Sequence, residues 1–145
     1  MTPKQSLEFV FFDIGGTLGE PDSATGQLIP FASSRKLLKS VRDVFGLRVG
    51  VITSLGPLSN AQGRVLLEQA GLAAFLDPQG FVSEHDNNEI AKPDPAIYRA
   101  AAERVSVPVD RCLYVGEDLI EVIGAIAAGM QALLKPSPPG RELPD

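Results

Sequence analysis

The sequence contains a single cysteine, which excludes an internal disulfide and any metal site built from several cysteines. That residue, Cys112, lies in the apolar run 112–115, where a thiol is more often an inert core side chain than a reactive one. Histidine is equally scarce. The only one, His85, lies in the polar stretch 83–89, so a histidine-rich metal site is excluded and a catalytic role for His85 is not favoured.

The sequence also lacks a long apolar run and an excess of positive charge. No apolar stretch approaches the length of a membrane span, and Lys4 alone precedes a strand-like segment, so no signal peptide is visible. The formal net charge of −5 disfavours bulk electrostatic binding to nucleic acid or to an anionic membrane. These absences predict a soluble, cytoplasmic protein that binds neither nucleic acid nor membrane.

The most informative stretch that is present covers residues 7–18. An apolar run, 9–12, ends abruptly at Asp13, and two glycines and a threonine follow. Such a run predicts a buried central strand of a parallel sheet, and open α/β sheets bind ligands outside the carboxyl ends of their strands. Gly15 and Gly16 allow the backbone to approach a ligand closely. The alternative is an ordinary strand-to-loop turn in which Asp13 caps its own backbone.

Strand and helix signals alternate along the rest of the chain. Further strands are expected at 47–53, near 80–83, and at 111–116 and 131–134, with a loop or small hairpin over 19–29. Helices are expected to begin at Ser33 or Ser34, at Ser59 or Asn60, after Asp94 as N-cap, and over 119–128. The first helix should carry apolar positions and end at a left-handed glycine: Leu37, Leu38, Val41, Val44 and Phe45, then Gly46.

This alternation predicts an α/β domain in three layers, with a five-stranded parallel sheet and helices on both faces. We expect a single domain over 1–145, with a core of about 7–135 and an irregular tail over 136–145. Three strands end in polar residues: Asp13, Thr53 and Glu117. Because the carboxyl ends of parallel strands share one edge, these residues should converge there, together with Lys92 at the start of a helix.

Four ordered motifs give the chain a resemblance to the haloacid dehalogenase-like (HAD) superfamily of phosphatases and phosphotransferases. The first is the apolar strand followed by Asp13-Ile14-Gly15-Gly16-Thr17-Leu18, and the second is a strand that ends at Thr53. The third is Lys92-Pro93-Asp94-Pro95. The fourth is Val115-Gly116-Glu117 with Glu121, followed by Gly124-Ala125 and Ala127-Ala128-Gly129-Met130.

The resemblance implies a Rossmann-like domain that transfers phosphoryl groups through an aspartyl-phosphate, with Mg²⁺ as cofactor. It implies three catalytic residues, Asp13, Thr53 and Lys92, and phosphate binding by Gly16, Thr53, Ser54 and Lys92. The metal ligands would be Asp13, the Gly15 carbonyl and Glu117, completed by Glu121 or Asp118. Structural alternatives are a simple strand end for Thr53, a surface lysine for Lys92, and N-cap or first-turn acids for Glu117 and Asp118.

Two positions depart from the family pattern. Gly15 stands where the family's hydrolases usually carry a second aspartate, which protonates the leaving group and later activates water. Acid–base help of this kind is worth about 100- to 10,000-fold, so ordinary phosphomonoester turnover should be poor. Glu117 replaces the usual aspartate and is longer by one methylene, which should weaken binding of Mg²⁺ with its strict octahedral geometry.

The spacing of the motifs leaves no room for a separate cap domain between Asp13 and Thr53 or between Thr53 and Lys92. A site without a cap is open, and open sites favour large substrates or protein partners. We expect the partner to be a phosphorylated small molecule or a protein. The first hypothesis is therefore a Mg²⁺-dependent phosphatase or phosphotransferase impaired at Gly15. The alternative is a catalytically inactive member that binds a phosphorylated ligand or a protein partner. The sequence does not determine the oligomeric state.

Overall fold

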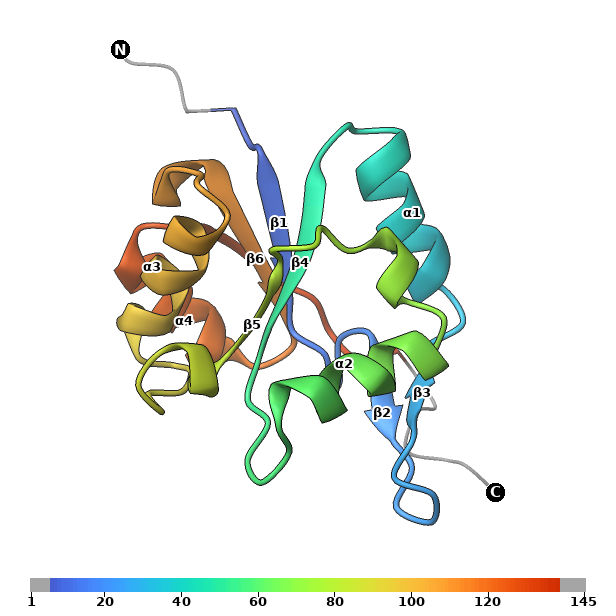
Figure 1. The fold of residues 1–145 in the computed structure, drawn as a ribbon. Helices are drawn as coiled ribbons and strands as arrows, with labels where there is room; N and C mark the ends of the chain where they lie inside the picture. Colours follow the sequence, from blue (N-terminus) through green and yellow to red (C-terminus); the bar gives the residue numbers. More distant parts are fainter. Residues whose placement is uncertain (1–5, 139–145) are drawn as a thin grey trace.

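The computed structural model describes residues 6–138 and consists of a parallel β-sheet with helices on both faces (Figure 1). The sheet has the strand order β5-β4-β1-β6-β7, which confirms the predicted five-stranded α/β architecture. Its strands are β1 (Phe9–Phe12), β4 (Arg48–Thr53), β5 (Phe81–Ser83), β6 (Cys112–Gly116) and β7 (Gln131–Leu134). The helices are α1 (Ser34–Asp43), α2 (Asn60–Gln69), α3 (Pro95–Arg104) and α4 (Leu119–Ala128).

Strand β1 is the central strand of the sheet, and every one of its side chains is buried. Phe9 and Phe11 belong to the core cluster shared with α3 and α4, and their rings stack with centroids 4.3 Å apart. Val10 and Phe12 belong to the core cluster on the other face, shared with α1 and α2. A strand covered on both faces needs apolar residues at every position, which explains the continuous run in the sequence.

The strand order places the predicted polar strand ends side by side. β1 pairs in parallel with β4 on one side and with β6 on the other, so Phe12 is in register with Val51 and with Val115. The backbone N–H of Asp13 extends this pairing and donates to the Val115 carbonyl at 2.9 Å. Asp13 therefore lies between the carboxyl ends of β4 and β6.

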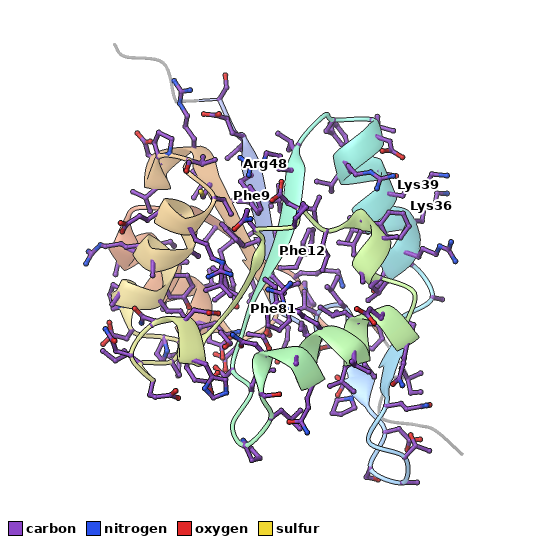
Figure 2. All side chains as sticks on the ribbon, in the orientation of Figure 1. Phe9, Phe12, Lys36, Lys39, Arg48 and Phe81 are labelled. Carbon is purple, nitrogen blue, oxygen red and sulfur yellow. The ribbon has the colours of Figure 1, made fainter. Side chains whose placement is uncertain are left out.

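Helix α1 begins at Ser34, as expected, and differs from its prediction at the carboxyl end. It ends at Asp43, so Val44 and Phe45 lie beyond it and are 74% and 70% exposed, and their assignment to the apolar face was wrong. Ser33 stands at the N-cap without a side-chain capping bond, while the Ser34 hydroxyl donates to the Leu18 carbonyl at 2.7 Å. The basic residues of α1 are exposed, and Figure 2 shows Lys36 and Lys39 pointing away from the molecule.

The segment after β1 forms the small antiparallel hairpin β2 (Gly19–Pro21) and β3 (Leu28–Pro30), as one of the two sequence alternatives predicted. The described start of the expected irregular tail, residues 136–138, has no regular secondary structure, and residues 139–145 lie outside the described residues. Within residues 6–138, no helix combines the length and the apolar character required to cross a membrane. That the chain is cytoplasmic and lacks a cap domain stays a prediction.

Candidate active site

The buried lysine of the third motif, Lys92, contacts carboxylates of the first and the fourth motif. The Lys92 Nζ atom lies 2.7 Å from Asp13 Oδ1 and 2.9 Å from Glu121 Oε1, and it donates to the Tyr114 hydroxyl at 3.2 Å. Only 2% of the Lys92 side chain is exposed. We call Asp13, Lys92, Tyr114 and Glu121 the Lys92 cluster. The buried position excludes the alternative that Lys92 is a surface lysine.

Helices α3 and α4 position this lysine from two sides. Lys92 lies just before α3, whose N-cap Asp94 accepts a hydrogen bond from the Ala96 N–H at 2.9 Å. Helix α4 approaches so closely that a Cβ atom on Gly124 would collide with the Pro93 carbonyl. The glycine of the fourth motif thus allows α4 to bring Glu121 within reach of Lys92.

Tyr114 completes the cluster from strand β6. Its hydroxyl donates to Glu121 Oε1 at 3.1 Å. Burial, followed by the nearby Asp13 and Glu121 carboxylates, raises the pKa of Tyr114 far above its ordinary value, so the hydroxyl stays protonated and remains a donor. The sequence prediction missed this residue, because strand periodicity gave the tyrosine a buried face but no partner.

The loop after Asp13 is held by groups distant in sequence. Thr17 Oγ1 accepts from the Glu117 N–H at 3.1 Å, while Lys135 Nζ donates to the Thr17 carbonyl at 2.9 Å. The Ser137 hydroxyl donates to the Gly16 carbonyl at 2.8 Å. Lys135, and Ser137 from the tail that was expected only to be irregular, therefore anchor the candidate site.

Gly16 and Gly15 differ in the space around them. Gly16 has φ +77°, and a Cβ atom there would lie 2.6 Å from Glu117 Cγ, so a glycine is required for Glu117 to lie against this loop. Gly15 is exposed, and a Cβ atom there would meet no atom within 4 Å. A side chain is therefore sterically acceptable at position 15, where the family pattern has aspartate.

The remaining predicted residues occupy the same sheet edge. Thr53 ends β4 and is buried, and Ser54 follows it and is exposed. Asp118 is the N-cap of α4 and accepts from the Ile120 N–H at 2.8 Å, as its structural alternative predicted. Cys112 is buried, and burial raises the pKa of its thiol to about 12, in agreement with an inert core side chain.

The donor set for a metal ion consists of oxygen atoms, as Mg²⁺ prefers. Glu121 contacts Lys92 and Tyr114, whereas the Glu117 carboxylate lies against the Gly15–Gly16 loop. Within residues 6–138, no three acidic, histidine or cysteine side chains are grouped so that they could hold a metal ion. The carboxylates of Asp13 and Glu117 and the carbonyl of Gly15 are oxygen donors of the required kind, and their role as metal ligands stays a prediction.

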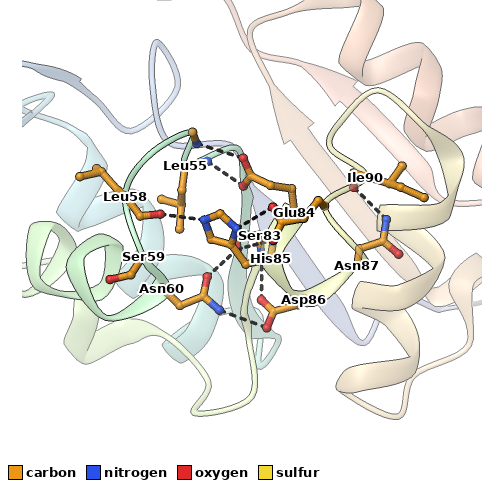
Figure 3. A network of polar contacts seen from close by, with 12 residues as sticks. Leu55, Leu58, Ser59, Asn60, Ser83, Glu84, His85, Asp86, Asn87 and Ile90 are labelled. Carbon is orange, nitrogen blue, oxygen red and sulfur yellow. Dashed lines mark hydrogen bonds and ion pairs between the residues drawn. The ribbon is translucent and has the colours of Figure 1, made fainter.

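A second polar network lies at the same edge, and sequence reasoning treated it as a plain loop (Figure 3). Buried Glu84 accepts from the backbone N–H groups of Leu55 and Gly56 at 2.8 and 3.0 Å. His85 lies with Nε2 2.7 Å from the Leu58 carbonyl and Nδ1 2.9 Å from Glu89. We call these contacts, with those of Ser83, Asp86 and Asn60, the Glu84 network. It fixes the loop that follows Thr53.

The family model for haloacid dehalogenase-like hydrolases matches residues 20–129, which is most of the chain. The chain belongs to the haloacid dehalogenase-like hydrolase family. The matched region includes Thr53, Lys92 and Glu117 but begins after Asp13 and Gly15, so the match does not test the first motif.

Two curated relatives of this HAD-like chain are named as phosphatases. Phosphatase MT3486 of Mycobacterium tuberculosis is 39% identical over 89 residues, covering 61% of this chain and 39% of the relative. The phosphoglycolate phosphatase of Rhodospirillum rubrum is 38% identical over 91 residues, covering 61% of this chain and 34% of the relative. The chain thus matches between about a third and two fifths of the length of these relatives.

Solved structures show the same fold at low sequence identity. An uncharacterized protein from Listeria monocytogenes has a TM-score of 0.75 at 19% identity, covering 87% of this chain and 76% of that one. A HAD family hydrolase from Deinococcus radiodurans with bound phosphate and sodium has a TM-score of 0.69 at 14% identity, covering 87% and 79%. These similarities support the three-layer HAD-like architecture.

Proposed function

We propose that this chain transfers or hydrolyses phosphoryl groups, with Asp13 as the nucleophile. The contact between Asp13 and buried Lys92 at 2.7 Å is the observation that carries the proposal. It joins the carboxylate that would attack phosphorus to the cation that would neutralise the transferring group. The phosphatase names of two relatives support the same reaction class.

In the first step, an Asp13 oxygen attacks phosphorus, and the bond from phosphorus to the leaving oxygen breaks with its electron pair on that oxygen. The second step is attack of water on the resulting aspartyl-phosphate, which releases phosphate and restores the carboxylate. Thr53, Ser54 and the Gly16 backbone are the proposed donors to the phosphoryl oxygens. Lys92 is held in place for this role by Glu121 and Tyr114.

The charges of the site favour a divalent cation. Asp13 and Glu121 share the single ammonium group of Lys92, and Glu117 adds a further carboxylate nearby. A surplus of negative charge repels an anionic substrate. Asp13, the Gly15 carbonyl and Glu117 would hold Mg²⁺, which when bound supplies positive charge for the phosphoryl oxygens. Glu121, one of the ligands suggested by the family motif, serves here to orient Lys92.

The absence of a side chain at Gly15 sets the expected substrate preference. No acid at this position protonates the leaving group, so phosphate donors whose leaving group departs as a stable anion should react best. The same feature favours a second candidate function, a catalytically inactive HAD-fold protein that binds a phosphorylated ligand or a protein partner. The two candidates differ in turnover, and binding of a phosphorylated ligand uses the same phosphate site as the reaction.

Hydrolysis of acetyl phosphate in the presence of Mg²⁺ tests the proposal, because this donor needs no proton on its leaving group. We expect slow, enzyme-dependent phosphate release that EDTA abolishes. Mg²⁺ alone should raise the Tm of the wild-type chain and do so less in Asp13→Asn. Stabilisation by Mg²⁺ and phosphate without any turnover would favour the binding function. No response of either kind would contradict both candidates.

A further inference from the structure

A cavity of about 240 Å³ lies beside the candidate active site. The hairpin contributes Leu28 to its wall, while Leu58 and Leu66 come from α2 and the loop before it. Its floor is shared with the proposed phosphate site, since Thr53 and Ser54 line it as well. The cavity is therefore continuous with the place where a phosphoryl group would bind.

The lining of this cavity is free of charge. None of its eleven lining residues has an ionisable side chain. Neighbouring cavities differ in this respect, because the one formed by the hairpin contains Glu20 and Asp22, and one beside α2 contains Arg64 and Glu68. A ligand that fits both places has a charged group, which lies at the charged site, and an apolar group, which lies in the uncharged cavity.

The size of the cavity limits what it can hold. An apolar cavity of about 150 Å³ is enough for benzene, while drug-sized ligands occupy about 300–1,000 Å³. At about 240 Å³ this cavity accepts one aromatic ring or an alkyl group of similar size. It is too small for a nucleoside.

Gly15 lies in the lining of the cavity, two positions after the proposed nucleophile Asp13 in the sequence. A Cβ atom there would meet nothing within 4 Å, so an aspartate at this position would extend into open space and bring a charge to the cavity. The residue that removes the usual acid thus also keeps this cavity apolar. Both effects select the same leaving groups, because aryl oxygens leave without protonation far more readily than alkyl oxygens.

We propose that the cavity binds the aromatic ring of an aryl phosphomonoester, while the phosphoryl group lies at Asp13. This inference rests on the proposed function, since it assumes that Asp13, Thr53 and Lys92 bind the phosphoryl group. It names the substrate class as small aryl phosphates rather than sugar phosphates or nucleotides.

Phosphonates test the cavity without any reaction. Benzylphosphonate and methylphosphonate share the anionic group and differ in the ring, and neither is hydrolysed. Binding to the wild-type chain is measured by titration, with inorganic phosphate as the reference ligand and Mg²⁺ present. We expect benzylphosphonate to bind at least about tenfold more tightly than methylphosphonate, because its ring leaves water.

Two adjacent positions on α2 provide a matched pair of variants. Leu66 lines the cavity, and Val65 is 43% exposed and does not line it. Leu66→Trp should fill the cavity and remove the advantage of the benzyl group, leaving methylphosphonate binding unchanged. Val65→Trp should keep the advantage. If Leu66→Trp does not fold, Leu66→Gln replaces it as the test. Glutamine has nearly the volume of leucine, and its polar amide should reduce the advantage of the benzyl group.

The outcomes separate this inference from the proposed function. Binding of phosphate and methylphosphonate without a benzyl advantage would overturn the cavity assignment and leave the function in place. Failure of every phosphonate and of phosphate to bind would contradict the function. In that case an NMR titration with benzyl alcohol tests the cavity alone. Shifts of the Leu28, Leu58 and Leu66 methyl resonances would support the cavity assignment, and unchanged resonances would overturn it.

Discussion

The Lys92 cluster and the Glu84 network both place carboxylates at the same edge of the sheet, but the hydrogen-bond and ion-pair partners of these carboxylates differ. Glu84 accepts from two backbone N–H groups, at Leu55 and Gly56. Asp13 and Glu121 instead share the ammonium group of Lys92. The first arrangement completes the bonding of its carboxylate, and the second leaves negative charge that a bound cation can neutralise.

The difference shows that an acidic residue at the ligand-binding edge is not by itself a catalytic one. Glu84 is buried and near the candidate site, but its oxygens are already occupied by the backbone of the loop after Thr53. What distinguishes Asp13 is a side-chain partner that itself carries charge. The comparison therefore predicts that mutations in the Lys92 cluster reduce activity and that mutations in the Glu84 network reduce stability.

The largest expected effect is the loss of activity in Asp13→Asn. Asparagine cannot form the aspartyl-phosphate, so hydrolysis of acetyl phosphate should fall at least about 1,000-fold. The fold should persist, because Lys92 keeps its contacts with Glu121 and Tyr114. Glu84→Gln is the matched control at the same edge, and it should retain activity within about tenfold. Equal losses in the two variants would remove the distinction between cluster and network.

The next largest effect is a gain. Gly15→Asp places a carboxylate where the family's hydrolases carry their acid and base, in space that the structure leaves open. Wild-type chain mixed with p-nitrophenyl phosphate should release a burst of nitrophenolate approaching one equivalent and then turn over slowly, because breakdown of phospho-Asp13 lacks a base. The variant should lose the burst and turn over about 10- to 1,000-fold faster.

Rapid mixing with absorbance detection of nitrophenolate measures both quantities. A linear wild-type time course, together with no gain in Gly15→Asp, would contradict the proposed mechanism and favour the binding function. Melting curves of the variant serve as the control for folding.

Sequence reasoning predicted the parts of the molecule that follow general rules. The run 9–12 had to be a central strand because a strand buried on both faces is apolar throughout. Asp13, Thr53 and Glu117 were expected at one edge because parallel strands end together, and the strand order agrees. Lys92 was expected at the same edge because it opens a helix there, and the family resemblance implied that it acts with Asp13 on one phosphoryl group; the direct contact between the two was not predicted.

What the sequence did not predict depends on contacts between distant groups. Glu84 binds backbone N–H groups, which every residue except proline offers, so no side-chain pattern marks its partners. Tyr114 reaches Lys92 across 22 positions, and periodicity assigns only its face. Phe45 fits a helical repeat by spacing alone, but α1 ends before it. The end of a helix depends on local bonding that the spacing of apolar residues does not describe.

A third effect concerns stability. Glu84→Gln replaces a carboxylate that accepts from two backbone donors by an amide, whose NH₂ group faces a donor instead. The free energy of unfolding should fall by about 1–3 kcal/mol, the usual cost of an unsatisfied buried group. Urea denaturation of both proteins at neutral pH measures the difference. A change below about 0.5 kcal/mol, the range of ordinary surface substitutions, would mean that the network does not stabilise the loop.

The smallest effect is the dependence of that difference on pH. Burial opposes ionisation of Glu84, but the backbone N–H groups of Leu55, Gly56 and Glu84 itself, together with the charge of His85, outweigh it and hold the pKa of the carboxyl below its ordinary value of 4.5. A carboxyl with a lowered pKa in the folded state stabilises the protein fully above the pKa of the unfolded chain, and this stabilisation is lost as the pH falls through the folded pKa. Glutamine does not titrate, and the other carboxyl groups are common to both proteins. The difference in unfolding free energy between wild type and Glu84→Gln should therefore rise slightly between neutral pH and about pH 5, as His85 becomes protonated beside ionised Glu84, and shrink below pH 4.5. Urea titrations at a series of pH values measure it, and a difference that grows below pH 4.5 would show that the Leu55 and Gly56 donors do not stabilise the ionised form.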